Sequence, residues 1–350
     1  MFLSPPVAYE KQVIDHREVY EEVMKNHGKP IPLASRSTYN PATKSFFAFC
    51  DSYVPAPAKY RQDLWAEVGY PQGPDTYGDL MTGAARISDK FGNPCGLGLS
   101  RETDSDTALH ALLWSFGGAE QTEEGQPALD SKNTIDAVTY MRDLYRKSET
   151  AEVFSWTPSS NNQALRLGKV SFVVDPIDVT HDAAETVQLR PTLKALNRLA
   201  PAHTLPCYVV WKFAENKEGA KQFLSDLVNH SEAACKASLF YNLPSFPSSV
   251  PDIDKLLAND LTAISPNIQS VANRSMLASS NKNAVLLNAA KWLVNAGYPG
   301  FLNAAISEAA ATFVIPTMFA KAARDEMTPE KAVKAADQEL RRIFAKWKQH

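Results

Sequence analysis

Several residues in this chain are of types that carry out chemistry, but their spacing matches no catalytic motif. Acidic residues are plentiful, yet no two of them stand out as the pair of carboxylates that a glycosidase needs. The chain has no G-x-S-x-G elbow, no P-loop and no Cys and His at a familiar catalytic spacing. The run GLGLS at 96–100 is not the G-x-G-x-x-G of a dinucleotide site. We therefore expect a protein that is not an enzyme and that has no cofactor.

The chain has four cysteines, namely Cys50, Cys95, Cys207 and Cys235. None belongs to a C-x-x-C pair, and no histidine stands at metal-ligand spacing around them. An even number permits disulfides without arguing for them, and we expect free, mostly buried thiols. The sequence therefore predicts no metal site.

Composition and charge limit the partners. Hydrophobic residues make up 44% of the chain and charged residues 21%, the balance of a globular protein. The formal net charge is −3, and Lys and Arg are scattered among acids, so we expect no nucleic-acid partner. No apolar run is long enough to span a membrane, and MFLSPPVAYEKQV at the start shows no signal peptide. A length of 350 residues favours two domains.

Alternating strand and helix patterns indicate an α/β protein in two parts. The run from Cys207 to Trp211 is rich in β-branched and aromatic residues, which predicts a buried strand. A helix capped by Asn216 follows, and its expected apolar stripe is Ala220, Phe223, Leu224 and Leu227. A strand and helix this late in the chain suggest a return to a layer begun earlier.

Helix starts are the clearest local signals. Thr76 begins a capping box, Ser131 is an N-cap, and Thr328-Pro329 places a cap before a proline at the first helical position. Pro316 is expected to kink or split a long helix.

Several segments, in order, resemble a known family. They are YRQDL at 60–64, the capped helix at Thr76, GLGLSRETDSD, LLWSFGG, the helix at Ser131, SWTPSSNNQALRLGKVSF, the strand and helix from 205 to 227, GYPGFLNAAI and MTPEKAVKAADQEL. This order and spacing resemble the carbohydrate-binding class of extracellular solute-binding proteins, the receptors of ATP-driven (ABC) importers. The resemblance runs from about residue 12 to the C-terminus.

The resemblance implies a two-lobed fold of the periplasmic-binding-protein type II, with an interlobe hinge. Residues 1–60 and 206–300 would form lobe one, and residues 61–205 and 301–350 lobe two. Crossings would lie at Tyr60 to Arg61, before Tyr208, and at Gly297 to Gly300. The family further implies a periplasmic or extracellular monomer that binds a carbohydrate or polyol and delivers it to ABC transporter permease subunits.

One segment of the family pattern has no counterpart in this sequence. Relatives begin with a strand-helix-strand segment that builds the core of lobe one and part of the sugar site. Either the given start lies downstream of the true one, which we favour, or the chain is a shortened relative with an incomplete first lobe.

The resemblance also implies candidate ligand-binding residues. Glu102 and Asp104 follow the GLGLS strand and would accept hydrogen bonds from hydroxyls. Asp104 could instead cap the next helix. Asp175, at a strand end before Pro176, is the strongest single carboxylate, and its alternative is a turn residue. The aromatic residue that many relatives have after this proline is here Ile177, which weakens ring stacking at that point.

Aromatic faces would pack against the apolar side of a sugar ring. Tyr298, in the turn GYPG, would face the cleft or be an exposed loop residue. Tyr208 and Trp211 lie at the second crossing, and their three-residue step puts them on opposite sides of a strand, one facing the core. Trp156 and Asn161 lie in a polar loop that could close over the ligand, or they could be surface and cap residues.

Two alternatives to a sugar-binding receptor stay open. The first is a carbohydrate-active hydrolase that uses a similar cleft. The second is a truncated remnant of the family that binds no ligand.

Overall fold

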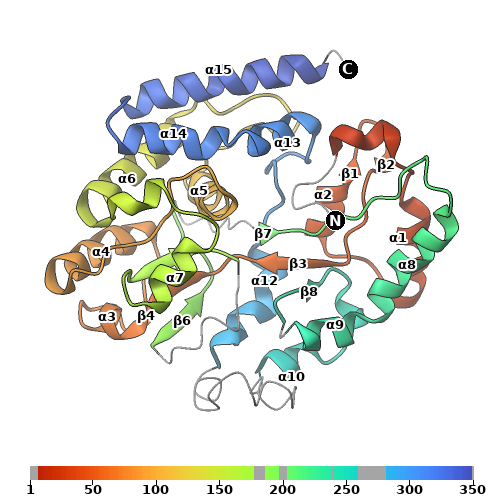
Figure 1. Ribbon diagram of the computed structural model, residues 1–350, viewed down its shortest axis with the longest axis horizontal. Helices are drawn as coiled ribbons and strands as arrows, with labels where there is room; N and C mark the ends of the chain where they lie inside the picture. Colours follow the sequence, from red (N-terminus) through yellow and green to blue (C-terminus); the bar gives the residue numbers. More distant parts are fainter. Residues whose placement is uncertain (1–6, 177–185, 197–202, 239, 259–280, 349–350) are drawn as a thin grey trace.

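Two small antiparallel sheets organise the fold (Figure 1). The computed structural model describes residues 7–176, 186–196, 203–238, 240–258 and 281–348. One sheet has the order β5 (Phe172–Val174), β4 (Ala58–Arg61), β6 (Val187–Arg190), and the other has the order β7 (His203–Thr204), β3 (Ser52–Pro55), β8 (Leu243–Pro244). A hairpin pairs β1 (Tyr39–Asn40) with β2 (Ser45–Phe46). The expected α/β content is confirmed.

The chain passes directly from one sheet to the other between β3 and β4. Ala56 and Pro57 form the connection, and Pro55 ends β3. Proline has no N–H to donate to a ladder, so the two prolines separate the two pairings. All residues from Ser52 to Tyr60 are buried, so this crossing runs through the interior of the molecule.

Helices surround each sheet. With β4–β6 lie α3 (Gln62–Ala66), α4 (Tyr77–Phe91), α5 (Thr103–Ser115), α6 (Lys132–Ser148), η2 (Ala151–Phe154), α7 (Ser160–Arg166), α13 (Ala304–Ala311), α14 (Val314–Ala323) and α15 (Pro329–Lys348). On the other side lie η1 (Val7–Gln12), α1 (Arg17–His27), α2 (Pro32–Thr38), α8 (Lys217–Asn229), α9 (Ser231–Ala237), η3 (Pro247–Ser249), α10 (Ile253–Ala258) and α12 (Ala289–Trp292). The remaining element, η6 (Asn281–Asn288), contacts both β6 and α10. No helix among the described residues is both long enough and apolar enough to cross a membrane.

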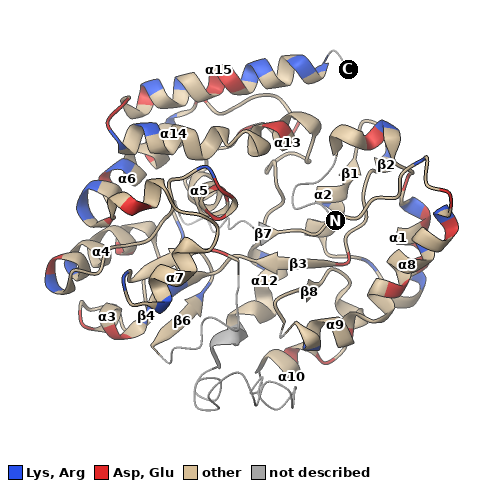
Figure 2. Cartoon of the chain, viewed as in Figure 1, with Lys and Arg blue, Asp and Glu red and all other residues tan. Residues whose placement is uncertain are grey.

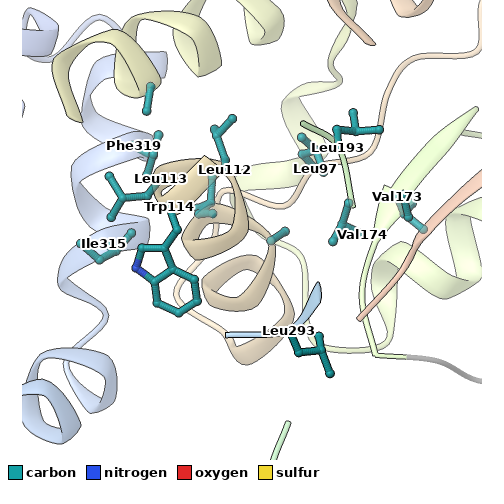
Figure 3. Close-up of a cluster of buried hydrophobic side chains, with 14 of the residues drawn as sticks. Leu97, Leu112, Leu113, Trp114, Val173, Val174, Leu193, Leu293, Ile315 and Phe319 are labelled. Atoms are coloured by element: carbon teal, nitrogen blue, oxygen red, sulfur yellow. The ribbon is translucent and has the colours of Figure 1, made fainter. Parts of the chain in front are cut away.

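Two clusters of buried apolar side chains hold these layers together. In the larger cluster, α14 packs against α5 and α6, and Leu112, Ile315 and Phe319 are among the side chains drawn in Figure 3. A smaller cluster joins α1 to α8 through Val19, Tyr20 and Val228. Lys, Arg, Asp and Glu are intermixed along outer helices such as α6, α8 and α15 (Figure 2).

The expected helix starts are confirmed. Thr76 and Asp79 form the complete capping box of α4, and Ser131 and Asn216 accept backbone N–H bonds at the starts of α6 and α8. The long helix near Pro316 is split, because Phe313 adopts a left-handed conformation with φ of 57° between α13 and α14.

The prediction of a regular strand from Cys207 to Trp211 was wrong. Tyr208 pairs with Phe49 and Trp211 with Val13 as isolated bridges. Between these bridges, the N–H of Val210 donates to the imidazole Nε2 of His16 at 2.9 Å, so a side chain takes the place of a neighbouring backbone. The stripe of α8 also needs correction, because Phe223 is 59% exposed while Leu224 and Val228 are buried.

A turn near residue 300 is held from two sides. Arg36 of α2 donates to the Asn295 side chain at 3.0 Å and to the Pro299 carbonyl at 2.6 Å. From the loop before α6, Gln121 Nε2 donates to the carbonyls of Gly297 at 2.6 Å and Phe301 at 2.8 Å. The Gln121 side chain thus replaces backbone partners that this turn lacks.

Replacing Gln121 by Met should destabilise the protein. The change keeps the length of the side chain but leaves the buried Gly297 carbonyl, the partly buried Phe301 carbonyl and the Asn303 amide, which donates to Gln121 Oε1, without their partner. We expect a loss of about 2–5 kcal/mol in the free energy of unfolding, measured by urea denaturation. The exposed Gln72→Met is the matched control, with an expected change within about 0.5 kcal/mol. Equal losses in the two variants would contradict this role for Gln121.

Candidate functional site

A buried ion pair lies at the end of the sheet formed by β4–β6. Lys59 Nζ lies 2.9 Å from Asp175 Oδ1, and both side chains are 0% exposed. The register explains the contact: Lys59 lies opposite Val173, and Asp175 is two residues further along on the same face of the sheet. Lys59 also donates to the Asn162 side chain at 3.1 Å and to the Pro176 carbonyl at 3.3 Å. The end of the strand therefore holds a buried ion pair whose two charges cancel.

Asp104 is buried in the first turn of α5. The cap of this helix is Glu102, whose carboxylate accepts the backbone N–H groups of both Asp104 and Ser105. The alternative that Asp104 caps the helix is therefore wrong. Gly98 permits the close packing, because a Cβ there would lie 2.1 Å from the Ser105 hydroxyl.

The buried Asp104 carboxyl lies close to two other carboxylates, those of Asp175 and Glu102. Asn161 of α7 donates its side-chain amide to Asp104 Oδ2 at 3.2 Å. Burial, followed by the charges of Asp175 and Glu102, raises the pKa of Asp104 to about 7, against the smaller opposing effects of Asn161 and Lys59. The Asp104 carboxyl can therefore gain or lose a proton near neutral pH.

Tyr241 approaches this group from the other half of the molecule. It lies between α9 and β8, and β8 belongs to the sheet built on β3. Burial raises the pKa of Tyr241, and the charges of Asp104 and Asp175 raise it further. Tyr241 as a whole residue is 37% exposed, so part of it is in contact with solvent. The charges of two carboxylates thus act on a phenol from the other half, and both kinds of group can hydrogen-bond to hydroxyls.

The structure thus brings together three of the residues predicted from sequence, Asp104, Asn161 and Asp175, and places Glu102 directly behind them. Trp156 supports the same region: its ring covers Gly96, where a Cβ would lie 2.9 Å from the indole, and its carbonyl accepts the Ser100 hydroxyl at 2.7 Å. A ligand role for each of these residues stays a prediction.

The remaining predicted residues lie in other contacts. Tyr208 packs against the smaller apolar cluster, while Trp211 packs against the larger one, stacks on Phe213 and meets Tyr9 edge-on. The two side chains therefore lie on opposite sides of their segment, as expected, but both are half-buried. Tyr298 is half-buried, and its ring centroid lies 6.3 Å from that of Trp114.

Trp114 belongs to a second buried polar group. His110 Nε2 lies 2.9 Å from Glu120 Oε1, and the Trp114 indole donates to Glu120 Oε2 at 3.2 Å. Burial alone would lower the pKa of His110, but Asp106 and Glu120 outweigh it and raise this pKa well above its ordinary value. A cavity of about 80 Å³ adjoins the group. Within the described ranges, no cluster of three or more His, Cys, Asp or Glu could hold a metal ion.

Sequence reasoning missed Lys59, Asn162 and Tyr241. The available signal for Lys59 was a cation in an otherwise apolar stretch beside two prolines, where a buried charge needs a partner. Tyr241 carries no such signal, because its place opposite Asp104 depends on how the two sheets are packed.

Removing the lysine of the buried pair should be costly. Lys59→Met leaves the Asp175 charge buried without its cation, with an expected loss of about 3–5 kcal/mol in the free energy of unfolding. The double variant Lys59→Met/Asp175→Leu should recover most of this loss in a denaturation experiment. As a control, Lys90→Met breaks an exposed ion pair with Glu67 and should cost less than about 1 kcal/mol. The role of the pair would be refuted if both single variants behaved alike.

Asp104 should make stability depend on pH. Its pKa in the folded state, about 7, lies above the ordinary carboxyl value, so the folded protein binds a proton that the unfolded chain has released. Stability should therefore fall as pH rises from about 4 to 7 through this group. Asp104→Asn removes that contribution. The difference in stability between the variant and the parent protein should therefore shift in favour of the variant when the pH is raised from 4 to 8. Parallel stability curves for the two proteins over this range would contradict the assignment.

Comparisons with known proteins agree with this architecture. Among solved structures, maltose-bound MalE3 of T. maritima superposes with a TM-score of 0.73 at 19% identity, covering 97% of this chain and 82% of that one. An oligosaccharide periplasmic-binding protein from Synechococcus sp. MITs9220 gives a TM-score of 0.77 at 17% identity, covering 99% and 84%. Likenesses at this identity show the fold, which is the two-lobed α/β fold of periplasmic binding proteins.

Sequence comparison defines the family. Curated binding proteins of Brucella abortus and Brucella suis are 22% identical over 152 residues, which is 43% of this chain. The matched part spans about a third, 32%, of the length of those relatives. The sequence profile of the bacterial extracellular solute-binding proteins matches residues 39–233, more than half of the chain. The chain belongs to the family of bacterial extracellular solute-binding proteins.

Proposed function

We propose that this protein binds a sugar, oligosaccharide or polyol in a cleft between its two lobes. The observation that carries the proposal is the group of Asp104, Asn161 and Tyr241, which brings a carboxylate, an amide and a phenol together from both halves of the chain. Such groups donate to and accept from hydroxyls. Several proteins with the same fold have bound sugars in their structures, including maltose in one and cycloalternan in another.

The lobes would divide as the sequence suggests. Lobe one would contain residues 1–60 and 206–300, and lobe two residues 61–205 and 301–350. In support, β3 and β4 belong to different sheets although they are close in sequence, and the chain passes between them at Ala56 and Pro57, a few residues before the proposed boundary at residue 60. Closing the hinge would bring Tyr241 towards Asp104 and bury the ligand between them.

The remaining site residues would act around this centre. Glu102 would fix the start of α5, and Asp175 would set the charge beside Asp104 rather than touch the ligand, because both of its oxygens are buried. Trp156 would lie behind the ligand on the lobe-two side of the cleft. Tyr208, Trp211 and Tyr298 would line the segments that join the lobes.

Family membership supports the wider role. The protein would act outside the cytoplasm, in the periplasm or extracellular space, as a monomer. It would deliver its ligand to the permease subunits of an ABC importer, where a partner protein hydrolyses ATP.

A carbohydrate-active hydrolase is the competing function. A carboxyl with a pKa near 7 beside an ionised carboxylate is an arrangement that glycosidases use. Here, however, the second carboxylate is Asp175, which is fully buried and paired with Lys59, so it is shielded from a substrate. This burial favours a binding protein.

A panel of sugars and polyols tests the proposal. A true ligand should raise the melting temperature and be recovered unchanged after long incubation. Asp104→Ala should weaken binding of that ligand by roughly ten-fold or more, because a charged hydrogen bond contributes about 1.5–3 kcal/mol. Turnover of a glycoside would favour the hydrolase, and the absence of any melting shift across the panel would favour the non-binding remnant.

The pH dependence of binding gives a sharper version of this test. If a ligand hydroxyl donates to the Asp104 carboxylate, binding favours the deprotonated form, so affinity should rise between pH 6 and pH 8. Calorimetry in buffers with different ionisation enthalpies should then detect proton release. Asp104→Asn should bind with no such dependence. Unchanged proton release in this variant would exclude Asp104 as the titrating group.

A further inference from the structure

Two buried cysteines lie next to an antiparallel bridge between neighbouring segments. Phe49 and Tyr208 form an antiparallel bridge and exchange both backbone hydrogen bonds, each 2.8 Å long. In such a ladder, the adjacent pair of residues is not hydrogen-bonded, and its Cα atoms lie about 4.5 Å apart. One residue onward from Phe49 is Cys50, and one residue back from Tyr208 is Cys207.

The two thiols are on the same side of this ladder. Cys50 and Cys207 both belong to the larger apolar cluster, and both are 0% exposed. Phe49 and Tyr208, the pair beside them, pack in the smaller cluster on the opposite side. Burial, and then the neighbouring Cys207, raises the pKa of the Cys50 thiol, which indicates that the two sulfurs are close.

The register further along the segments is compatible with this pairing. Val54 of β3 pairs with Thr204 of β7, so the two segments run antiparallel on both sides of the cysteines. One extra residue between Phe49 and Val54 forms a bulge, because four residues there face three between Thr204 and Tyr208. The Cys50 thiol donates to the Ser52 carbonyl at 2.9 Å and lies 3.3 Å from the Ser245 hydroxyl, so forming a disulfide would require it to leave these two partners.

We propose that Cys50 and Cys207 are joined by a disulfide when the protein is outside the cytoplasm. All four thiols are free in the structure, but an opposed, non-hydrogen-bonded pair has the Cα separation that a disulfide requires, about 4.4–6.8 Å. Exported proteins meet oxidising conditions in which such bonds persist. The proposal does not depend on which ligand the protein binds.

The oxidant would be an external disulfide, either glutathione disulfide or the oxidised form of a dithiol oxidoreductase. One cysteine thiolate attacks a sulfur of that disulfide and displaces one thiolate, which gives a mixed disulfide. The second cysteine thiolate then attacks the protein sulfur of this mixed disulfide and releases the other thiolate. Two electrons pass to the oxidant, and the two thiol protons end on its released thiols. Because both cysteines are buried in the folded chain, the exchange takes place during folding.

The bond would link two segments that lead towards the proposed crossings between the lobes. Cys50 lies just before β3, and Cys207 lies just after β7. It would close a long loop, and cross-links of long loops restrict the unfolded chain most strongly. We expect the melting temperature of the oxidised protein to exceed that of the reduced protein by about 4–8 °C.

Peptide mapping tests the proposal directly. The full chain is unfolded, refolded with reduced and oxidised glutathione, checked by circular dichroism, unfolded again with iodoacetamide and digested with trypsin. We expect a peptide in which residues 45–59 are linked to residues 199–212, with Cys95 and Cys235 alkylated. A correctly folded protein with four alkylated cysteines, or one with a bond from Cys50 to Cys235, would overturn the proposal.

Variants provide a second readout. Cys50→Ser and Cys207→Ser should each abolish the difference in melting temperature between oxidised and reduced protein. Cys95→Ser is the matched control, because Cys95 is equally buried but lies beside Glu149 in the other half, and this variant should keep the difference. Loss of the difference in the Cys95 variant alone would also contradict the proposed pairing. The peptide map of the parent chain still tests the proposed disulfide even if a variant fails to fold.

Discussion

The ion pair between Lys59 and Asp175 is the contact on which the proposed site depends. Burying two charges in the sheet is tolerated only because the antiparallel register of β4 and β5 brings them together within 2.9 Å. Burial, and after it the charge of Asp175, raises the pKa of Asp104, so a residue paired inside the sheet influences the protonation of a carboxyl at its edge. A change in the register of β4 by one residue would point Lys59 away from Asp175 and remove this coupling.

Among the described residues, the segments proposed to join the two lobes are fixed in three different ways. The first is the buried passage between β3 and β4, where prolines separate two ladders. The second is the antiparallel pairing of residues 49–55 with 203–208, interrupted by a bulge. In the third, near residue 300, the Arg36 and Gln121 side chains bind the backbone of a turn. A motion of one half relative to the other would therefore bend short segments whose ends are firmly held.

Irregular segments owe their stability to side chains that replace missing backbone partners. His16 is fully buried, its Nδ1 lies 3.0 Å from the Phe46 carbonyl, and its Nε2 accepts from Val210. This arrangement requires a neutral imidazole, and burial lowers the pKa of His16 accordingly. Gln121 plays the same part for the turn near residue 300. These side chains supply hydrogen bonds to buried backbone groups where the short sheets provide no backbone partner.

The sequence by itself determined the local structure and the class of the protein. Helix starts at Thr76, Ser131 and Asn216 were predictable, because a cap depends on residues only three positions apart. The order of the motifs was enough to indicate the family. The strand expected at Cys207 to Trp211 failed, because whether an apolar run joins a ladder depends on distant neighbours.

Only the tertiary structure decided how the candidate site is assembled. Glu102 caps the helix, so Asp104 is available to accept a hydrogen bond from Asn161. Asp175 forms an ion pair with a lysine more than a hundred positions away in the sequence. The tertiary structure also placed Tyr241 near both carboxylates. These contacts depend on strand register and on the packing of two sheets, and both are set by the whole chain rather than by neighbouring residues.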